Sequence, residues 1–380
     1  MSRRSSPGST LEDTLRITSR GRVLGGIALI GSSALVLAGC AAAPESTDDS
    51  TDGATDFIPC MVSDLGGFDD KSFNQLGFEG INEAADAAGT KAITVQSDAE
   101  TDYGPNIQEL VNQGCNLIVT VGFALSAATV EAALANPDVE FAIIDDAADN
   151  DFDGTTDAPN IKPIVFNTAQ AAFLVGYAAA SYSKAGIVAT WGGMNFPTVA
   201  IFSDGFAQGV AYYNSEKGTA VQVLGYDTAN PDAYTLTGGF EANDVAKSTA
   251  QNFIDQGADV LLPVGGPIYQ SAVAAIADSG KDIALVGVDA DLFVTDPTTE
   301  DIILTSILKG IKQATSDVVT AAANGDFSAD AYVGTLENEG VGYADFHNFA
   351  SKVSPDLQGE LDTISDGIKD GSIPVASYLG

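Results

Sequence analysis

One stretch near the start of the expected domain gathers the residue types of a small-molecule site. An apolar run at 58–62 predicts a buried strand, and Asp64, two glycines, Phe73 and Asn74 follow it into an expected helix. In open α/β sheets, small molecules bind beyond the carboxyl ends of the strands. These side chains could hydrogen-bond a polar ligand and stack on a planar one. The alternative is that Asp64 and Asn74 only cap a turn and Phe73 is core.

Signals for a nucleophilic catalytic site or a metal site are weaker. The single histidine, His347, lies in a late loop far from any Ser or Cys motif, which leaves neither a His-based metal cluster nor an evident nucleophile pair. The segment 149–157 follows the start of an EF-hand loop, but Asn160 stands where the bidentate Glu belongs and no helix pair flanks it. We expect a solvated acidic loop, no metal site and no cofactor.

The charge of the chain limits the kinds of ligand. The chain has 380 residues and a formal net charge of −36, and all five arginines fall within residues 1–39. Beyond them remain 11 lysines against 50 acidic residues. Nucleic-acid binding relies on neutralising phosphates, so it is not expected. Amino acids, peptides and phosphorylated sugars are also disfavoured, because their sites usually use the guanidinium fork. A neutral polar ligand fits this composition better.

The N-terminal segment predicts export and anchoring. Arginines precede an apolar run at 23–37, and Leu-Ala-Gly-Cys then ends at Cys40 in the manner of a bacterial lipobox. We expect a lipoprotein signal peptide over residues 1–39, acylation of Cys40, and a disordered acidic tether over 40–56. An ordinary secretory peptide with a chance cysteine is the alternative. Outside the cell, Cys60 and Cys115 could form a disulfide or remain two buried thiols.

From residue 57 onward the chain alternates apolar runs with helical patterns, which favours parallel strands joined by helices. Two such series predict two doubly wound α/β domains joined by a hinge of several crossings, with a cleft between them. The second series is read with a strand at 199–202, and a later helix is placed at 306–324. The expected domains are 57–166 with 292–326, and 167–291 with 327–380. Hinges are expected near Asn167, Asp291 and Phe327.

Eight short motifs carry a resemblance to a known family. They are DLGGFDDKSFNQ from residue 64, GF at 122, FAIID at 141, AAFLVGYAAA at 171, GFAQG at 205, GADV at 257, VGVDAD at 286 and LTSILK at 304. In this order they resemble the basic membrane lipoproteins, the extracytoplasmic receptors of nucleoside ABC importers. The resemblance implies a type I periplasmic-binding-protein fold, and it extends over essentially the whole chain after the tether.

The resemblance also implies a site. A purine base would lie between the rings of Phe73 and Phe240, with Asn74 and Asp145 at its polar edge. Asp64, Asp289 and Lys309 would hold the ribose hydroxyls, and Gly265 or Gly266 would let the backbone approach. The implied partners are a nucleoside, an ABC permease with its ATPase, and the membrane through the lipid anchor, the receptor itself being monomeric. The alternatives are a secreted nucleoside hydrolase, and a surface adhesin or sensor without a transport role.

Overall fold

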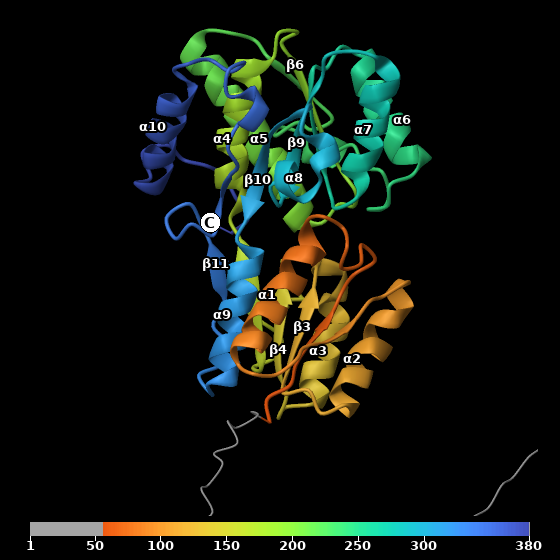
Figure 1. Cartoon of the computed structure of the whole chain (residues 1–380). Helices are drawn as coiled ribbons and strands as arrows, with labels where there is room; N and C mark the ends of the chain where they lie inside the picture. Colours follow the sequence, from red (N-terminus) through yellow and green to blue (C-terminus); the bar gives the residue numbers. More distant parts are fainter. Residues whose placement is uncertain (1–55, 380) are drawn as a thin grey trace, which may run out of the picture. The chain divides into compact units, whose positions relative to one another are not determined.

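Two six-stranded sheets organise residues 56–379, which are the part of the chain that the computed structural model describes (Figure 1). The first sheet has the order β11-β5-β4-β3-β1-β2, and all its strand pairs are parallel. Its strands are β1 (Pro59–Val62), β2 (Ile93–Val95), β3 (Leu117–Val121), β4 (Glu140–Ile144), β5 (Ile161–Phe166) and β11 (Tyr332–Gly334). Its helices are α1 (Phe73–Ala87), α2 (Tyr103–Asn112), α3 (Ser126–Ala135) and α9 (Ile311–Ala323), of which α9 packs on α1.

The second sheet repeats this plan. Its order is β12-β10-β9-β8-β6-β7, and β12 alone is antiparallel to its neighbour. Its strands are β6 (Ile187–Gly192), β7 (Gln222–Leu224), β8 (Val260–Val264), β9 (Ala284–Asp289), β10 (Ile303–Lys309) and β12 (Val341–Tyr343). Its helices are α4 (Thr168–Tyr182), α5 (Pro197–Lys217), α6 (Asp244–Asp255), α7 (Ile268–Ser279), α8 (Leu292–Thr295) and α10 (Leu357–Lys369). We call the two halves the first and second lobe. They confirm the predicted pair of doubly wound domains.

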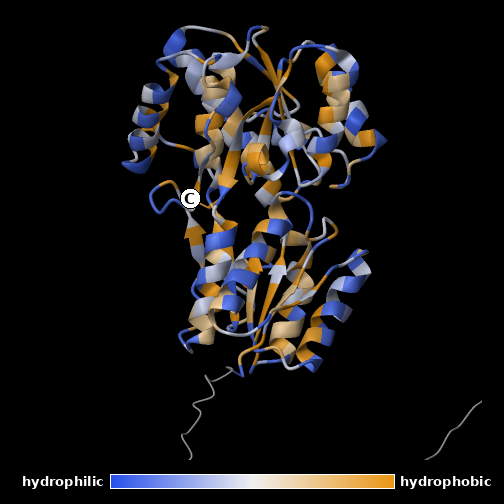
Figure 2. Ribbon diagram, viewed as in Figure 1, coloured by the Kyte–Doolittle hydropathy of each residue, from blue (hydrophilic) through white to orange (hydrophobic). Residues whose placement is uncertain are grey.

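The central strands are mostly apolar because helices cover both faces of each sheet. Every residue of β3, β8 and β9 is buried, which is typical of parallel sheets. The colouring by hydropathy shows these strands as the apolar interior (Figure 2). In both sheets the first strand of the lobe lies between the second and third, so strand order reverses at β1/β3 and at β6/β8. Ligand sites of such sheets form at this reversal, beyond the carboxyl ends.

Two predicted elements are wrong. The run 199–202 lies inside α5, and the strand of that region is β6 at Ile187–Gly192. The helical repeat of apolar residues in α5 is hard to recognise in the sequence because this helix packs closely on α4. A Cβ on Gly209, for example, would lie 2.0 Å from the Phe173 carbonyl oxygen. Residues 306–309 belong to β10 instead of starting a helix, and α9 begins at Ile311.

The lobes exchange segments at points that differ from the predicted limits. The first crossing follows β5 at Asn167, as expected. The second comes at Gly310, not near Asp291, because β10 pairs with β9 and stays in the second sheet. The third lies between β11 and β12, beyond the predicted Phe327, because β11 pairs with β5. The predicted assignment of 292–309 to the first domain and of β11 to the second is therefore corrected.

Cys60 and Cys115 form a disulfide in the first lobe. Cys60 is in β1, and Cys115 lies just before the neighbouring strand β3. The bond resolves the alternative left open by the sequence, and it closes a segment with a sequence separation of 55. Bonds of this kind typically contribute about 2–4 kcal/mol to stability. None of the helices between residues 56 and 379 is long and apolar enough to cross a membrane. The expected signal peptide, Cys40 and nearly all of the tether lie outside the described residues.

Candidate functional site

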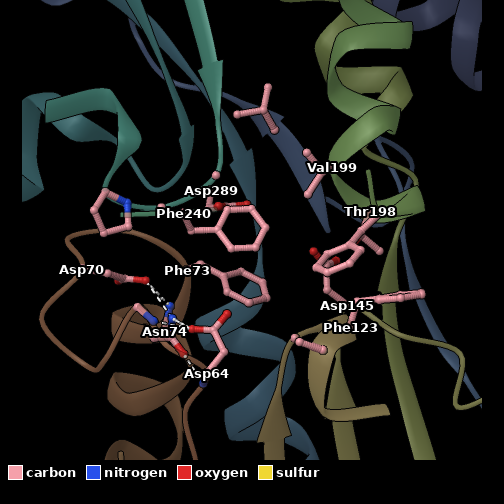
Figure 3. Close-up of a pocket in the computed structure, with 18 of the residues that line it drawn as sticks. Asp64, Asp70, Phe73, Asn74, Phe123, Asp145, Thr198, Val199, Phe240 and Asp289 are labelled. Atoms are coloured by element: carbon pink, nitrogen blue, oxygen red, sulfur yellow. Dashed lines mark hydrogen bonds between the residues drawn. The ribbon is translucent and has the colours of Figure 1, made fainter. Parts of the chain in front are cut away.

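A pocket lies where the carboxyl ends of the two sheets approach each other, and the strand ends supply most of its walls (Figure 3). Asp64 follows β1, Asp145 follows β4, and Asp289 and Lys309 end β9 and β10. All nine predicted ligand-binding residues line this one pocket: Asp64, Phe73, Asn74, Asp145, Phe240, Gly265, Gly266, Asp289 and Lys309. The structure therefore brings together residues that lie up to 245 positions apart, from both lobes.

Asn74 holds Asp64 in place. Its amide nitrogen donates to Asp64 Oδ1 at 2.8 Å and to Asp70 Oδ2 at 3.0 Å, and its oxygen accepts from the Asp64 backbone N–H at 3.3 Å. Figure 3 shows these bonds as a chain from Asp70 through Asn74 to Asp64. Both amide hydrogens are thus used, and the side chain is buried. The resemblance implied that Asn74 contacts a base, whereas this geometry supports a role in orienting Asp64.

Asp70 fixes the start of α1. Its carboxylate accepts from the backbone N–H groups of Ser72, Asn74 and Gln75 at 2.8 to 3.1 Å. A carboxylate at a helix N-terminus satisfies otherwise unpaired donors and interacts favourably with the helix dipole. From the same turn, Ser72 Oγ donates to the Val288 carbonyl of the second lobe at 2.7 Å. The turn after β1 therefore positions Asp64 and also contacts the other lobe.

Lys309 lies between two carboxylates at the opposite wall. Its Nζ is 2.5 Å from Asp145 Oδ2 and 3.4 Å from Asp289 Oδ1, and only 1% of the lysine side chain is exposed. Asp145 Oδ1 is buried without a hydrogen bond in the described part of the protein, and Asp289 Oδ1 is buried with only the long ion pair to Lys309. Burying a polar atom unpaired is costly, so these oxygens suit a ligand that donates hydrogen bonds.

Asp145 and Asp289 share an unusual backbone conformation. Each has φ of +64°, in the left-handed region, at the carboxyl end of the fourth strand of its lobe. Asp and Asn adopt this region more readily than other residues with side chains. Strained positions of this kind cluster at functional sites, and here one from each lobe meets the same lysine.

Burial dominates the acid–base properties of these groups. It raises the pKa of Asp64 to about 6, although the bonds from Gly66 and Asn74 counteract it. Burial likewise raises the pKa of Asp289 to about 6 against the opposing effect of Lys309, and it raises the pKa of Asp145. For Lys309, burial alone would lower the pKa, but Asp145 and Asp289 outweigh it and leave the pKa above its ordinary value. The lysine therefore carries a charge at neutral pH.

The raised pKa values predict how stability depends on pH. An Asp whose pKa rises on folding from 3.8 to about 6 binds its proton more tightly in the folded state. Its stabilising contribution is fully present below pH 3.8 and is lost as the pH rises through 6. We expect Asp64→Asn/Asp289→Asn to flatten the fall in unfolding free energy between pH 4 and 7, by a few kcal/mol at most. Urea denaturation between pH 4 and 7 measures the unfolding free energy of the wild type and of the variant. An equally steep fall in both proteins would contradict the expectation.

Aromatic rings from both lobes line the pocket. Phe73 begins α1, and Phe240 comes from the loop before α6 in the second lobe. Figure 3 shows both rings extending into the same space. Gly265, with φ of +135°, provides room for the Phe240 ring, since a Cβ there would lie 2.4 Å from it. Gly265 thus supports the ring, while Gly266 faces open space, where a ligand can approach its backbone.

Several residues of the pocket were not predicted from the sequence. Phe123, after β3, and Phe196, before α5, stack across the lobes with ring centroids 4.7 Å apart. Phe196 could be found only after recognising β6 and the helix start at Pro197, whereas Asp70 carries the ordinary signal of a helix cap. The other residues not predicted for this pocket are Gly66, Gly122, Ala124, Thr198, Val199, Phe202, Val264 and Pro267.

The acidic loop at 149–157 is far less buried than this pocket. The Asp149, Asp151 and Asp153 carboxylates approach within 4.8 Å of one another. Asp149 and Asp151 accept hydrogen bonds from the backbone N–H groups of Asp153 and Gly154, so donors within the loop already pair with these carboxylates. The expectation of a solvated acidic loop without metal stays a prediction. His347 pairs with Asp291 at 2.8 Å and stacks on Phe293, outside the pocket.

Two doubly wound lobes with a ligand-sized pocket between their strand ends define the class of two-lobed solute receptors. Residues 57–374 match the family of PnrA-like ABC transporter substrate-binding proteins, known as Bmp, and the chain belongs to this family. The resemblance seen in the sequence is thereby confirmed.

Individual proteins agree with this assignment. The chain is 27% identical over 370 residues to the CD4+ T-cell-stimulating antigen of Listeria innocua, which covers 92% of this chain and 96% of that protein. It is 27% identical to the ABC transporter nucleoside-binding protein BmpA of Lactococcus lactis, over 84% of this chain and 90% of that protein. A solved solute-binding protein of an ABC transporter system from Aeropyrum pernix superposes with a TM-score of 0.72 at 23% identity, covering 85% of this chain and 94% of that one. This likeness confirms the predicted fold.

Proposed function

We propose that this substrate-binding protein captures a purine nucleoside outside the cytoplasm and delivers it to an ABC permease. The observation that carries the proposal is the composition of the pocket: phenylalanine rings from both lobes, with four carboxylates and one lysine in the remaining wall. The Lactococcus relative, named as nucleoside-binding, supports the same ligand class. The protein would act as a monomer that closes on its ligand through the three crossings.

Each part of a nucleoside has a complementary surface in this pocket. A nucleobase stacked on Phe73 and Phe240 would gain about 1–3 kcal/mol per ring, as in other aromatic base sites. The buried oxygens Asp145 Oδ1 and Asp289 Oδ1 can accept from base N–H groups and ribose hydroxyls. Asp64, which Asn74 orients, adds a third acceptor. Lys309, held between Asp145 and Asp289, can donate to the sugar.

Two other activities fit the site less well. A nucleoside hydrolase of the calcium-dependent kind needs several carboxylates free at the end of the first strand. Here Asp70 lines the pocket but its carboxylate already accepts from three helix N–H groups, and Asp69 is exposed beside Lys71. Asp64 is therefore the acid of this group best placed to meet a ligand. An adhesin would not need a buried pocket with charged groups from both lobes, and membership of the ABC transporter substrate-binding family favours transport over a sensor role.

Loss of either ring should weaken nucleoside binding more than folding. We expect Phe73→Leu or Phe240→Leu to lower adenosine affinity by about 1–3 kcal/mol, because leucine keeps bulk but lacks the π-face. Titration calorimetry measures the affinity, and urea denaturation measures the stability. Phe68→Leu is the control, since Phe68 packs on Phe78 away from the pocket. Equal losses of affinity and stability would instead identify these rings as core.

Lipid anchoring through Cys40 completes the proposal. The Leu-Ala-Gly-Cys sequence predicts that Cys40 becomes the acylated N-terminus and tethers the protein to the membrane. We expect Cys40→Ala to abolish labelling by a fatty-acid analogue and to move the protein from the membrane to the soluble fraction. Cys60→Ala/Cys115→Ala is the control, because it removes both cysteines of the buried disulfide and leaves Cys40 in place. Undiminished labelling of the Cys40 variant would refute the anchor.

A further inference from the structure

A second cavity of about 370 Å³ adjoins the nucleoside pocket. The residues that line both cavities are Asp64, Gly66, Ala124, Phe196, Phe240 and Pro267. Phe196 and Phe240 have ring centroids 6.0 Å apart, so two rings of the second lobe form the aromatic part of this boundary, and Asp64 and Ala124 come from the first lobe. A group attached to a ligand in the first pocket could therefore extend past these rings into the second cavity.

The second cavity has a distinct chemistry. Carboxylates come from both lobes: Asp64 and Glu100 from the first, and Glu241 from the second. Among the described residues that line it, none carries a positive charge. Tyr103 and Met194, together with the two shared rings, supply apolar surface. Such a cavity attracts cations, accepts alkyl groups and repels anions.

We propose that this cavity is a subsite for a substituent on the bound nucleoside, and that it selects neutral or amine-bearing substituents against anionic ones. The inference rests on the proposed function and adds a ligand class to it, namely substituted nucleosides without phosphate. The first pocket supports the same selection, because its single lysine is buried between Asp145 and Asp289 and has no charge to spare for a phosphate.

The exposure of the cavity's carboxylates determines how strongly they act on a charged substituent. Glu100 and Glu241 are both exposed, so water and salt screen them. Their combined effect on a terminal charge should be about tenfold in affinity at low salt and only a few-fold at about 0.5 M salt. Selection by this cavity is therefore expected to depend on ionic strength, unlike ring stacking in the first pocket.

A series of adenosine derivatives tests the subsite. One set carries a six-carbon chain on N6 that ends in a methyl, an amine or a carboxylate group, and the other compares 5′-amino-5′-deoxyadenosine with adenosine 5′-phosphate. Titration calorimetry with each compound should show, in at least one set, an amine that binds about tenfold more tightly than its anionic counterpart. In that set the compounds with a neutral or amine-bearing substituent should bind with an affinity within about tenfold of that of adenosine itself.

Variants of the two exposed acids link the result to the cavity. Glu100→Gln/Glu241→Gln should reduce the amine-to-anion ratio to a few-fold while leaving adenosine affinity unchanged, because neither residue lines the first pocket. An unchanged ratio in this variant would overturn the inference. So would a loss of more than about a hundredfold for every substituted compound while adenosine still binds. Absence of adenosine binding would instead overturn the proposed function, and the subsite with it.

Discussion

Lys309→Met should destabilise the protein by about 3–5 kcal/mol at pH 7, because it leaves two buried carboxylates without their cation. Lys309 lies 2.5 Å from Asp145 and 3.4 Å from Asp289, and all three side chains are less than 10% exposed. Methionine keeps most of the apolar stem of the side chain but lacks the ammonium, which now lies over the Phe202 ring. Urea denaturation measures the loss. Nucleoside affinity should fall as well, since the proposed donor to the ribose is removed.

Lys312→Met is the matched control. Lys312 follows Lys309 by three residues, but it is 45% exposed and pairs with Glu79 and Glu83 on the surface of α1. Exposed pairs contribute about 0–1 kcal/mol, so this variant should be close to wild type. The Lys309 deficit should also shrink toward pH 5, because protonation removes the uncompensated charge of Asp145 and Asp289. Equal losses of stability in the two variants would show that the buried ion cluster contributes no more than an exposed ion pair.

Asp289→Ala should abolish discrimination between ribose and deoxyribose. In wild type, a missing hydroxyl leaves a buried carboxylate oxygen unpaired, which costs about 1–3 kcal/mol. We therefore expect adenosine to bind more tightly than 2′-deoxyadenosine or 3′-deoxyadenosine, and adenine to bind most weakly. Without the Asp289 carboxylate the nucleoside series should converge. Titration calorimetry of the same four compounds with both proteins measures the change.

Two further variants separate recognition from backbone strain. Alanine tolerates a φ of +64° less well than Asp or Asn, so Asp289→Ala also carries a stability cost that Asp289→Asn avoids. Asp289→Asn should keep part of the discrimination, because its amide oxygen still accepts. Asp146→Asn is the control, since Asp146 is a buried acid that bonds to Ser126 and Ala148 outside the pocket. If Asp289→Ala preserves the ribose-to-deoxyribose ratio, Asp289 has no role in sugar recognition.

The residues predicted for the site line one pocket, whereas some of the predicted elements around them are misplaced. Each strand end that carries an acid or a lysine is preceded by an apolar run that is easy to recognise, as in β4 before Asp145 and β9 before Asp289. The ordered family motifs then supplied Phe240, whose loop position has no pattern of its own. Motif order along the chain carried this information, since periodicity cannot reveal which loops meet across two lobes.

The misplaced elements share a physical cause. α4 and the part of α5 up to Val210 are largely buried against each other and the second sheet, so neither shows the alternation of apolar and polar faces that marks a surface helix. A buried helix then resembles a buried strand over four residues, as at 199–202. The role of Asn74 was beyond reach for a different reason. Only the positions of Asp64 and Asp70 show that its amide hydrogens are already used.

The most direct test of the account is titration calorimetry of the chain from residue 41 onward with adenosine at pH 7.4, followed by chromatography of the ligand. We expect one nucleoside per chain, bound at micromolar concentration or below, and recovered intact. Absence of heat and of thermal stabilisation at millimolar adenosine, inosine and guanosine would contradict nucleoside capture in the cleft. Recovery of free base and ribose would contradict a receptor and favour a hydrolase.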